Sequence, residues 1–457
     1  MDVQDGENSL SQKDKVDRER CGFYVKRKRR NCRMLPAKGN KYCAEHLCFQ
    51  DDQFSANRDD LHKGNVEISK QTTVKKRVQC PLDPKHTVFE DRLEKHLKKC
   101  NSRGKTQQDY FEEHIHSGLL HCETAEDEKV PLNKIPKMEI YDLIKRVEKC
   151  YSESLLKIKK WCGSHPVLKE ELDNEEYGES TRKHFLQQAS LIDLLEKNDV
   201  FKKDKLAVLE FGAGKGKLSH WLQKAVGNVD NVEYYLIDRQ NHRHKFDCFH
   251  RGENQGPSFK RLYIDIEHLN LAKVSDLTQK NIVGIGKHLC GAATDFSLRC
   301  LAGGDRKQAE SNQASKKAKL DHNTNRIELI LFALCCYHKC SWPSFVGRDF
   351  FAANGFNKTD FHRITKICSW AVCGVRSIAK DSGDDELLGK EKDEMNTFQL
   401  NPEQKKEIGS KCKRLIDLGR IEYLRKHGYQ TELIYFIDSA VTLENVVLLA
   451  KPNITNG

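Results

Sequence analysis

The chain has 457 residues, enough to bury a large core and to hold two or three domains. Charged residues make up 32% of it, and its longest strongly apolar run, residues 329–337, is far too short to span a bilayer, which excludes a membrane-spanning protein. The N-terminus is polar and has no signal-peptide core, so we expect an intracellular protein of the nucleus or cytoplasm whose 18 cysteines bind metals or stay buried as thiols.

The net charge of +11 is concentrated in two short segments. Residues 21–46 contain eight basic residues and one acidic residue, and residues 75–100 contain eight basic and four acidic residues. These segments account for the whole excess, so the rest of the chain is neutral. A basic region beside a neutral body indicates a module that binds a polyanion, although solvated lysines without a partner would give the same composition.

The first basic segment carries a set of metal ligands. The ligands follow the spacing C-x10-C-x10-C-x2-H: Cys21, Cys32, Cys43 and His46. Three thiolates and one imidazole satisfy a tetrahedral structural zinc site, and Cys48 is a possible competing ligand. Because the intervening loops hold little apolar material, metal binding would supply the folding energy, about 10–16 kcal/mol. We predict a CCCH-type zinc finger over residues 18–50.

The second basic segment carries another set. Its ligands follow the spacing C-x5-H-x9-H-x3-C: Cys80, His86, His96 and Cys100. Residues 91–99 predict a short helix, and the last two ligands, four residues apart, lie on one face of it. The pattern resembles the CHHC fingers of some spliceosomal and RNA-modifying proteins. We predict a CHHC-type zinc finger over residues 75–103.

The region after the fingers separates them from a larger domain. Residues 104–136 are polar and predict a linker, and the periodicity of residues 140–161 predicts a helix at the edge of the next domain. That domain should span residues 137–452. Two polar inserts, near residues 303–326 and 380–396, are expected to form mobile surface loops within it.

A glycine-rich segment is the most informative part of this domain. The apolar residues 206–209 predict a buried strand, which ends at Glu210 and is followed by glycines at every second position: Gly212, Gly214 and Gly216. A dinucleotide site would place its third glycine where Lys217 stands, and Glu210 would oppose a phosphate. S-adenosylmethionine has an ammonium group and no phosphate, so it fits this motif better. A glycine-rich structural turn is the alternative.

Four more strands are predicted, and two of them end in acids. Their ranges are residues 232–237, 262–265, 281–286 and 327–334. Asp238 follows the first and is suited to the ribose hydroxyls of a cofactor, whereas Asp265 is suited to its adenine edge, although either acid could instead cap a helix. The pattern predicts an α/β fold with a Rossmann-like, doubly wound sheet and a ligand at the carboxyl ends of its strands.

The ends of the fourth and fifth strands should face the methyl acceptor. The (Asp/Asn)-Pro-Pro-(Tyr/Phe) motif of many base-amino methylases is absent there, which argues against methylation of an exocyclic amine. The fourth strand is followed instead by a set of polar candidates: Lys287, His288, Cys290 and Asp295. A Cys290 thiolate would suit 5-methylcytosine formation, which stays an alternative.

The fifth strand runs into a segment rich in cysteine. We expect His338 beside the acceptor site, although this histidine could simply cap the strand, and Cys335 and Cys336 could be core thiols. A third metal site is a further alternative, built from crowded ligands at Cys335, Cys336, His338 and Cys340.

Both finger spacings and four later segments resemble the eukaryotic tRNA 2'-O-methyltransferases that act at nucleotide 4 of the acceptor stem. The segments are residues 286–295, 333–340, 419–424 and 443–445, and the likeness covers roughly residues 18–451. The resemblance implies S-adenosylmethionine as the donor. It implies the ribose 2'-hydroxyl of cytidine or adenosine as the acceptor, in tRNAs for Gly, Pro and His.

This target agrees with the residues. The 2'-hydroxyls of A-form RNA line a shallow minor groove, so a methylase can reach one without flipping a base. The hydroxyl must lose a proton, and we predict that His288 or His338 orients or deprotonates it while Asp295 fixes the tautomer. If neither histidine does so, Lys287 or simple proximity becomes the better explanation.

A non-catalytic RNA-binding or splicing-associated protein with a degenerate Rossmann domain is the other interpretation. The intact set of acids and glycines argues against decay of a cofactor site: Glu210, Gly212, Gly214, Gly216, Asp238 and Asp265. We therefore expect an enzyme with two structural zinc ions and tRNA as its partner, with no membrane and no obligate protein partner.

Overall fold

The computed structural model divides the chain into two compact units, residues 1–105 and 106–457. It describes residues 20–25, 30–32, 34, 36, 41–43, 77–98, 100, 108–119, 130–227, 231–242, 245–250, 259–303, 326–372 and 398–453. The two predicted inserts, near residues 303–326 and 380–396, therefore lie almost entirely outside the described residues.

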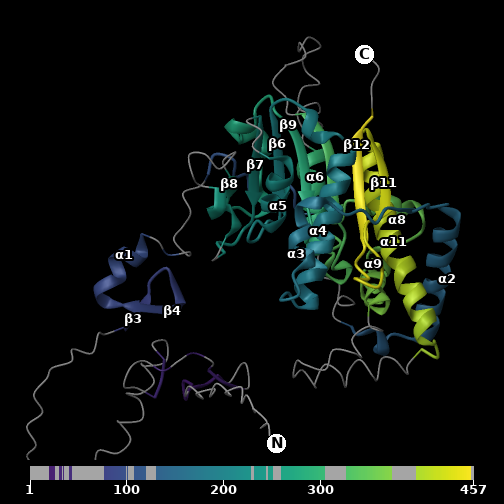
Figure 1. Ribbon diagram of the computed structural model, residues 1–457. Helices are drawn as coiled ribbons and strands as arrows, with labels where there is room; N and C mark the ends of the chain where they lie inside the picture. The colour runs from purple at the N-terminus through teal and green to yellow at the C-terminus, as the bar shows by residue number, and fades with distance from the viewer. Residues whose placement is uncertain are drawn as a thin grey trace, which may run out of the picture. The chain divides into compact units, whose positions relative to one another are not determined.

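The described part of the first unit contains short elements. Strands β1 (Tyr24–Val25) and β2 (Arg30–Asn31) pair antiparallel. Strands β3 (Arg77–Cys80) and β4 (Asp83–Phe89) form a second antiparallel pair. The predicted helix at residues 91–99 is present in part, as a 3-10 turn at Glu90–Arg92 followed by α1 (Leu93–Leu97) (Figure 1).

The second unit contains an eight-stranded sheet of order β5-β11-β12-β10-β9-β6-β7-β8. The strands are β5 (Lys159–Lys160), β6 (Leu206–Phe211), β7 (Val232–Ile237), β8 (Phe259–Leu262), β9 (Asn281–Gly286), β10 (Arg326–Ala333), β11 (Tyr429–Tyr435) and β12 (Val446–Pro452). Strands β6 to β10 pair in parallel, whereas β12 runs antiparallel between β10 and β11. Four of the five predicted strands are present where they were expected, the strand predicted at residues 262–265 is displaced to β8, and the sheet gains β5, β11 and β12.

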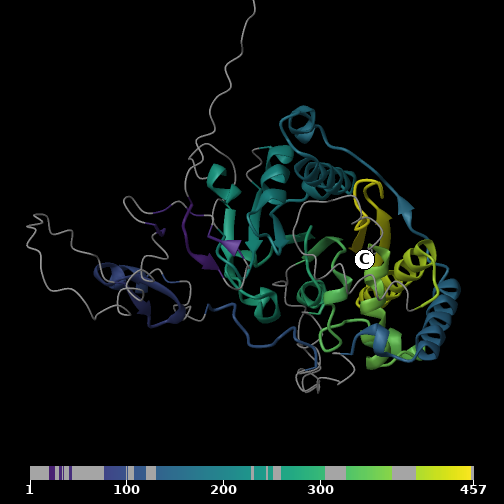
Figure 2. The ribbon, with the colours of Figure 1, turned by 90° about the horizontal axis from the view of Figure 1, so that it is seen from below.

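Helices cover both faces of this sheet (Figures 1 and 2). The helices are α2 (Lys137–Glu153), α3 (Lys169–Asp173), α4 (Glu179–Lys197), α5 (Lys217–Val226), α6 (Ala292–Ala302), α8 (Arg348–Ala353), α9 (Lys358–Ile367) and α11 (Pro402–Lys426). None of the helices in the described ranges is long and apolar enough to cross a membrane.

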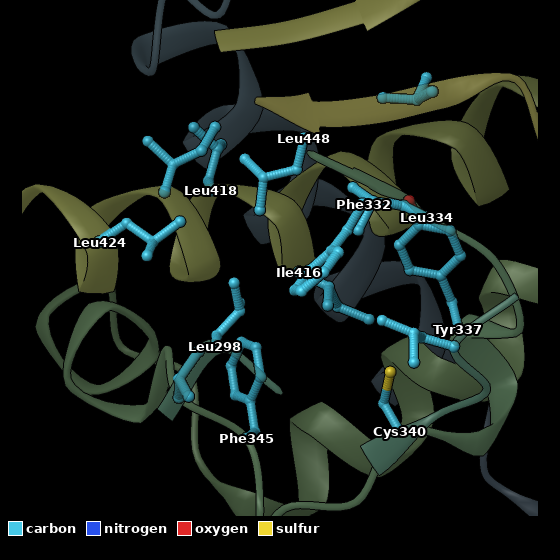
Figure 3. Packing of buried hydrophobic residues seen from close by; sticks show 14 of the residues in the cluster. Leu298, Phe332, Leu334, Tyr337, Cys340, Phe345, Ile416, Leu418, Leu424 and Leu448 are labelled. Atoms are coloured by element: carbon cyan, nitrogen blue, oxygen red, sulfur yellow. The ribbon is translucent and has the colours of Figure 1, made fainter. Parts of the chain in front are cut away.

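Alternate residues of the central strands enter two separate cores, because successive side chains of a strand point to opposite faces. On one face Val208 and Tyr234 pack with residues of α4 and α5. On the other face Leu209 and Tyr235 join residues of α2, α6, α9 and α11. Figure 3 shows this second core where Ile416 and Leu418 of α11 lie near Leu448 of β12 and Phe332 of β10.

Part of the segment that we expected to be a linker belongs to the second unit. Phe111 forms an isolated antiparallel bridge with Leu269. The backbone N–H of Glu112 donates to the carbonyl of His268 over 2.9 Å, and that of His116 donates to Glu267 over 3.0 Å. Residues 108–119 are thus fixed onto the second unit, beside the segment that follows β8.

Candidate active site and zinc centres

The glycine-rich segment forms the predicted tight turn between β6 and α5. Strand β6 is buried throughout because it pairs with β7 and β9 on either side. Gly212, Gly214 and Gly216 all have positive φ, at 64°, 52° and 78°, a conformation that side chains disfavour. A Cβ atom at Gly216 would lie 2.4 Å from Leu236 Cδ2, so this glycine is needed for packing. A Cβ atom at Gly214 would meet nothing within 4 Å, so open space lies over the middle of the turn.

Asp238 stands at the end of β7 and contacts this turn. Its carboxylate accepts hydrogen bonds from the backbone N–H of Gly214 over 2.8 Å and of Gln240 over 2.7 Å. His242 Nε2 lies 3.5 Å from the same carboxylate, whose side chain is 14% exposed. The acid therefore borders the open space over Gly214, where a ligand with vicinal hydroxyls would lie against it.

Asp265 lies farther along the same edge of the sheet. Strand β8 ends at Leu262, so the predicted strand at residues 262–265 is displaced and Asp265 follows the strand instead of ending it. Its carboxylate accepts from the backbone N–H of Glu267 over 3.3 Å and lies 3.5 Å from an Arg239 guanidinium nitrogen. Asp265 thus caps a 3-10 turn, Ile266–His268, and remains 35% exposed in its side chain.

Glu210 is placed differently from the other two acids. Its carboxylate is buried and accepts hydrogen bonds from the hydroxyl of Ser219 over 2.5 Å and from its backbone N–H over 3.0 Å. Burial raises the pKa of Glu210 to about 7, and the bonds from Ser219 oppose that rise. Glu210 therefore ties the first turn of α5 to the end of β6 through one of its carboxylate oxygens.

The segment after β9 packs directly on the glycine turn. A Cβ atom at Gly212 would lie 3.1 Å from Leu289 Cδ2 and 3.2 Å from the carbonyl oxygen of His288. Lys287 Nζ lies 3.0 Å from His184 Nδ1. Burial, together with the nearby charge of Lys217, lowers the pKa of Lys287 to about 8. The segment that carries the predicted acceptor residues thus packs against the glycine turn through Leu289 and the backbone of His288.

The predicted role of Asp295 is wrong. Asp295 is fully buried on the inner face of α6, where its carboxylate lies 2.9 Å from an Arg420 guanidinium nitrogen and accepts from the backbone N–H of Val346. It therefore neutralises a buried guanidinium and is not bonded to either candidate histidine. Tertiary packing against α11, which the local sequence does not reveal, decides this pairing.

The structure gathers a set of thiols and an imidazole that differs from the crowded set considered above. The ligand atoms lie within 4.8 Å of one another and belong to His288, Cys290, Cys335 and Cys336. Cys340 instead turns inward, where its sulfur accepts from Arg420 over 3.2 Å. His338 lies exposed on a 3-10 turn, Tyr337–Lys339. The set Cys335, Cys336, His338 and Cys340 is thus not brought together.

The CHHC finger has the geometry of a four-ligand metal site. The two sulfurs, of Cys80 and Cys100, lie 3.7 Å apart, and the Nε2 atoms of His86 and His96 lie 3.0 Å apart. His96 Nε2 is 3.2 Å from Cys80 Sγ, and Cys100 Sγ is 3.6 Å from His86 Nε2. These separations match the edges of a tetrahedron around zinc, and the predicted ligand set is confirmed as a cluster.

The CCCH finger is described in part. Cys21, Cys32 and Cys43 are buried together, with 3.9 Å between the sulfurs of Cys32 and Cys43. The backbone N–H of Cys43 donates to the sulfur of Cys21 over 3.1 Å, a contact typical of metal-bound thiolates. The fourth predicted ligand, His46, lies outside the described residues.

These features define a class of protein. The parallel sheet with one antiparallel strand inserted near its end, the glycine turn and the acids after β7 and β8 are those of a Rossmann-like methyltransferase, here preceded by zinc-finger modules. Residues 186–451 match the family model "Methyltransferase TRM13". Residues 19–47 match "CCCH zinc finger in TRM13 protein", and residues 77–101 match "U11-48K-like CHHC zinc finger". The chain belongs to the TRM13 methyltransferase family, and its predicted zinc fingers and methyltransferase domain are confirmed.

Curated relatives match along nearly the whole chain. Proteins from Mus musculus and Homo sapiens named "tRNA:m(4)X modification enzyme TRM13 homolog" are each 36% identical to it over 95% of this chain, and the match covers 94% and 95% of their own lengths. "tRNA:m(4)X modification enzyme TRM13" from Saccharomyces cerevisiae is 29% identical over 95% of this chain and 96% of its own length. The likeness therefore includes the fingers as well as the methyltransferase domain.

Proposed function

We propose that this protein transfers a methyl group from S-adenosylmethionine to the ribose 2'-hydroxyl of nucleotide 4 in the tRNA acceptor stem. The observation that carries this proposal is the match over 95% of the chain to relatives named as tRNA:m(4)X modification enzymes. That match joins both basic fingers to the methyltransferase unit. The acceptors are cytidine or adenosine in tRNAs for Gly, Pro and His, and the enzyme acts where tRNA is found, in the nucleus or cytoplasm.

The glycine turn fits the methyl donor. Gly214 leaves open space above the backbone, and Asp238 borders that space with a carboxylate able to accept two ribose hydroxyls. Asp265, farther along the sheet edge, faces the adenine. Glu210 supports the turn through Ser219 and remains, with the other two acids, a proposed residue of the donor site. When bound, the donor supplies a positively charged sulfonium that carries an electrophilic methyl group.

The acceptor hydroxyl belongs at the ends of β9 and β10. Lys287, His288 and His338 present polar atoms in the two segments after these strands, and the first segment packs on the glycine turn. We propose that one of these side chains orients the hydroxyl and takes its proton. Such a group contributes typically 10²–10⁴-fold to a rate.

The fingers supply recognition of the RNA. The basic excess of the chain lies in the two finger segments, and phosphate contacts position a protein on a duplex without reading its bases. The 2'-hydroxyl is displayed in the minor groove of an A-form stem. Recognition through helix shape and phosphates therefore suffices to bring a stem nucleotide to the active site without base flipping.

The test is methyl transfer from labelled S-adenosylmethionine to unmodified tRNA transcripts. The proposal predicts that the label appears at nucleotide 4 and makes the following phosphodiester resistant to alkaline cleavage, because the attacking 2'-hydroxyl is blocked. Label on a base, with cleavage unchanged, would contradict it. No transfer, with tRNA bound but no affinity for S-adenosylmethionine, would favour the non-catalytic RNA-binding protein.

A further inference from the structure

A second kind of site lies beside the acceptor position, at the ends of β9 and β10. It consists of three thiols and one imidazole from His288, Cys290, Cys335 and Cys336. We propose that these four residues bind a third zinc ion, inside the methyltransferase unit and separate from the two finger zincs. The proposal rests on the geometry of these side chains and does not depend on the proposed methyl transfer.

The separations of the ligand atoms carry the proposal. With Zn–S near 2.3 Å and Zn–N near 2.0–2.1 Å, a tetrahedral site has S–S edges of about 3.8 Å and S–N edges of about 3.6 Å. Cys290 Sγ lies 3.3 Å from Cys336 Sγ and 3.1 Å from His288 Nε2. Cys335 Sγ lies 3.6 Å from the other ring nitrogen, His288 Nδ1, so this contact is not an edge of a site in which Nε2 is the ligand. All four residues still offer one ligand atom each within 4.8 Å of one another. The corresponding S–S and S–N separations in the CHHC finger run from 3.2 to 3.7 Å, and the two Cys290 separations lie close to that range.

The backbone explains how two adjacent cysteines reach one point. Side chains of consecutive residues in an extended segment point to opposite sides, which would separate Cys335 from Cys336. Cys336 has a φ of 50°, in the left-handed region that residues other than glycine seldom adopt. This turn breaks the alternation and brings both sulfurs into the same group.

The two segments that supply the ligands are also pressed together. Gly291 has a φ of 58°, and a Cβ atom there would lie 2.0 Å from the carbonyl oxygen of Lys339. Glycine adopts this conformation without strain, so the turn lets the two segments approach closely. A metal ion bound by His288 and Cys290 on one side and by Cys335 and Cys336 on the other links the two segments at this distance.

The ligand types select the ion and its role. Three thiolates and one imidazole, with no carboxylate, favour zinc over calcium or magnesium. Four protein ligands close the coordination shell, so the ion is structural and leaves no position for substrate. It fixes the two strand ends that flank the acceptor. It also takes His288 and Cys290 as ligands, which leaves Lys287 and His338 to contact the ribose hydroxyl.

A disulfide between Cys290 and Cys336 is the competing arrangement. It would require the sulfurs to approach from 3.3 Å to about 2.05 Å, and it would leave Cys335 and His288 without a role. Thiol titration of the denatured, unreduced protein separates the two. The zinc site predicts all 18 thiols of the chain, whereas two fewer would overturn it.

Metal analysis of the full-length protein is the main test. We expect three zinc equivalents per chain in the wild type and two in Cys290→Ser and in Cys336→Ser. Cys248→Ser is the matched control, because Cys248 is an exposed cysteine of the same unit, and it should keep three. His288→Ala should lose the third zinc and His338→Ala should keep it, which also excludes the sequence-adjacent ligand set.

A second measurement covers variants that fail to fold. Cobalt(II) exchanged into the wild-type protein should give three equivalents with the visible absorption of tetrahedral, thiolate-bound cobalt. Two equivalents of metal in the wild type, or three in both folded cysteine variants, would overturn the third site. Neither the metal analysis nor the cobalt exchange uses tRNA or S-adenosylmethionine. The outcomes of both are therefore independent of the proposed methyl transfer.

Discussion

The two units are stabilised by different forces. In the described part of the CCCH finger, the buried cluster is three cysteines with Phe23 and Tyr42 packed against them. The methyltransferase unit instead has an apolar core on each face of an eight-stranded sheet. Little apolar area is buried in the finger, so its fold depends on a metal, whereas the larger unit is held by apolar burial. The proposed third zinc site, at His288, adds metal binding to the apolar burial that stabilises the larger unit.

The largest expected effect tests whether the fold of the CHHC finger depends on zinc. Cys80→Ser removes one ligand of the CHHC cluster, so zinc can no longer supply its folding energy, about 10–16 kcal/mol at neutral pH. We expect the loss of one zinc equivalent, rapid proteolysis within residues 77–100 and weaker tRNA binding. Calorimetry should find the main unfolding transition unchanged, as in the control Cys162→Ser, an exposed cysteine of the other unit. If the midpoint temperature of the main transition falls together with the loss of zinc, the two units do not unfold separately and the account is contradicted.

The next effect tests the core of the larger unit. Asp295→Ala leaves the buried guanidinium of Arg420 without its closest carboxylate, 2.9 Å away. Breaking a buried pair in this way costs about 3–5 kcal/mol, measured by chemical denaturation. The control Glu422→Ala removes a more exposed pair with Arg425 and should cost less than about 1 kcal/mol. If the Asp295→Ala variant is fully stable but transfers methyl groups slowly, the structural role is contradicted and the prediction that Asp295 fixes a histidine tautomer is supported.

Glu210 gives a pH-dependent test of the turn. Because burial raises its pKa in the folded state from 4.5 to about 7, the folded protein keeps a proton that the unfolded chain releases between these values. Stability therefore falls as pH rises through this window and levels off above it. Glu210→Gln removes this contribution. The free energy of unfolding of the variant, relative to that of the wild type, should therefore rise by at most about 3 kcal/mol between pH 5 and pH 8. Denaturation profiles that stay parallel over this range would show that Glu210 is ionised throughout.

The smallest effect separates cofactor binding from the fingers. Asp238→Ala removes the acceptor for the ribose hydroxyls, and a charge-assisted hydrogen bond contributes about 1.5–3 kcal/mol. Calorimetric titration should find weaker binding of S-adenosylmethionine by about 10- to 150-fold, with zinc content unchanged. Asp349→Ala, at an exposed acid of the same unit, is the matched control. Equal affinities of the two folded variants would remove Asp238 from the cofactor site.

The sequence predicted best what depends on local spacing. The glycine turn, Asp238 and the CHHC ligands each lie within a short segment whose conformation follows from its own residues. Strands β11 and β12 were missed although residues 429–435 and 446–452 are rich in apolar and β-branched residues. Strand β8 was displaced because its residues are only partly apolar and only half-buried.

The sequence predicted least what depends on neighbours in the sheet. Cys335 was grouped with Cys340 because they are close in the chain, whereas the structure groups it with His288, 47 residues away. That pairing follows from the adjacency of β9 and β10 in the sheet, which the spacing of cysteines along the chain does not reveal. Asp295 and Arg420, 125 residues apart, carried no comparable signal because α6 and α11 meet only in the folded core.

Site-specific deoxy substitution in the tRNA tests the central claim most directly. The full-length protein is given a transcript with a single 2'-deoxy residue at nucleotide 4, beside one with the same change at nucleotide 5. Methyl transfer requires a hydroxyl at the reacting ribose, and the loss of one 2'-hydroxyl elsewhere leaves the helix and its phosphates in place. The account predicts that transfer from S-adenosylmethionine disappears with the first transcript and persists with the second. Equal transfer to both transcripts would contradict 2'-O-methylation at nucleotide 4.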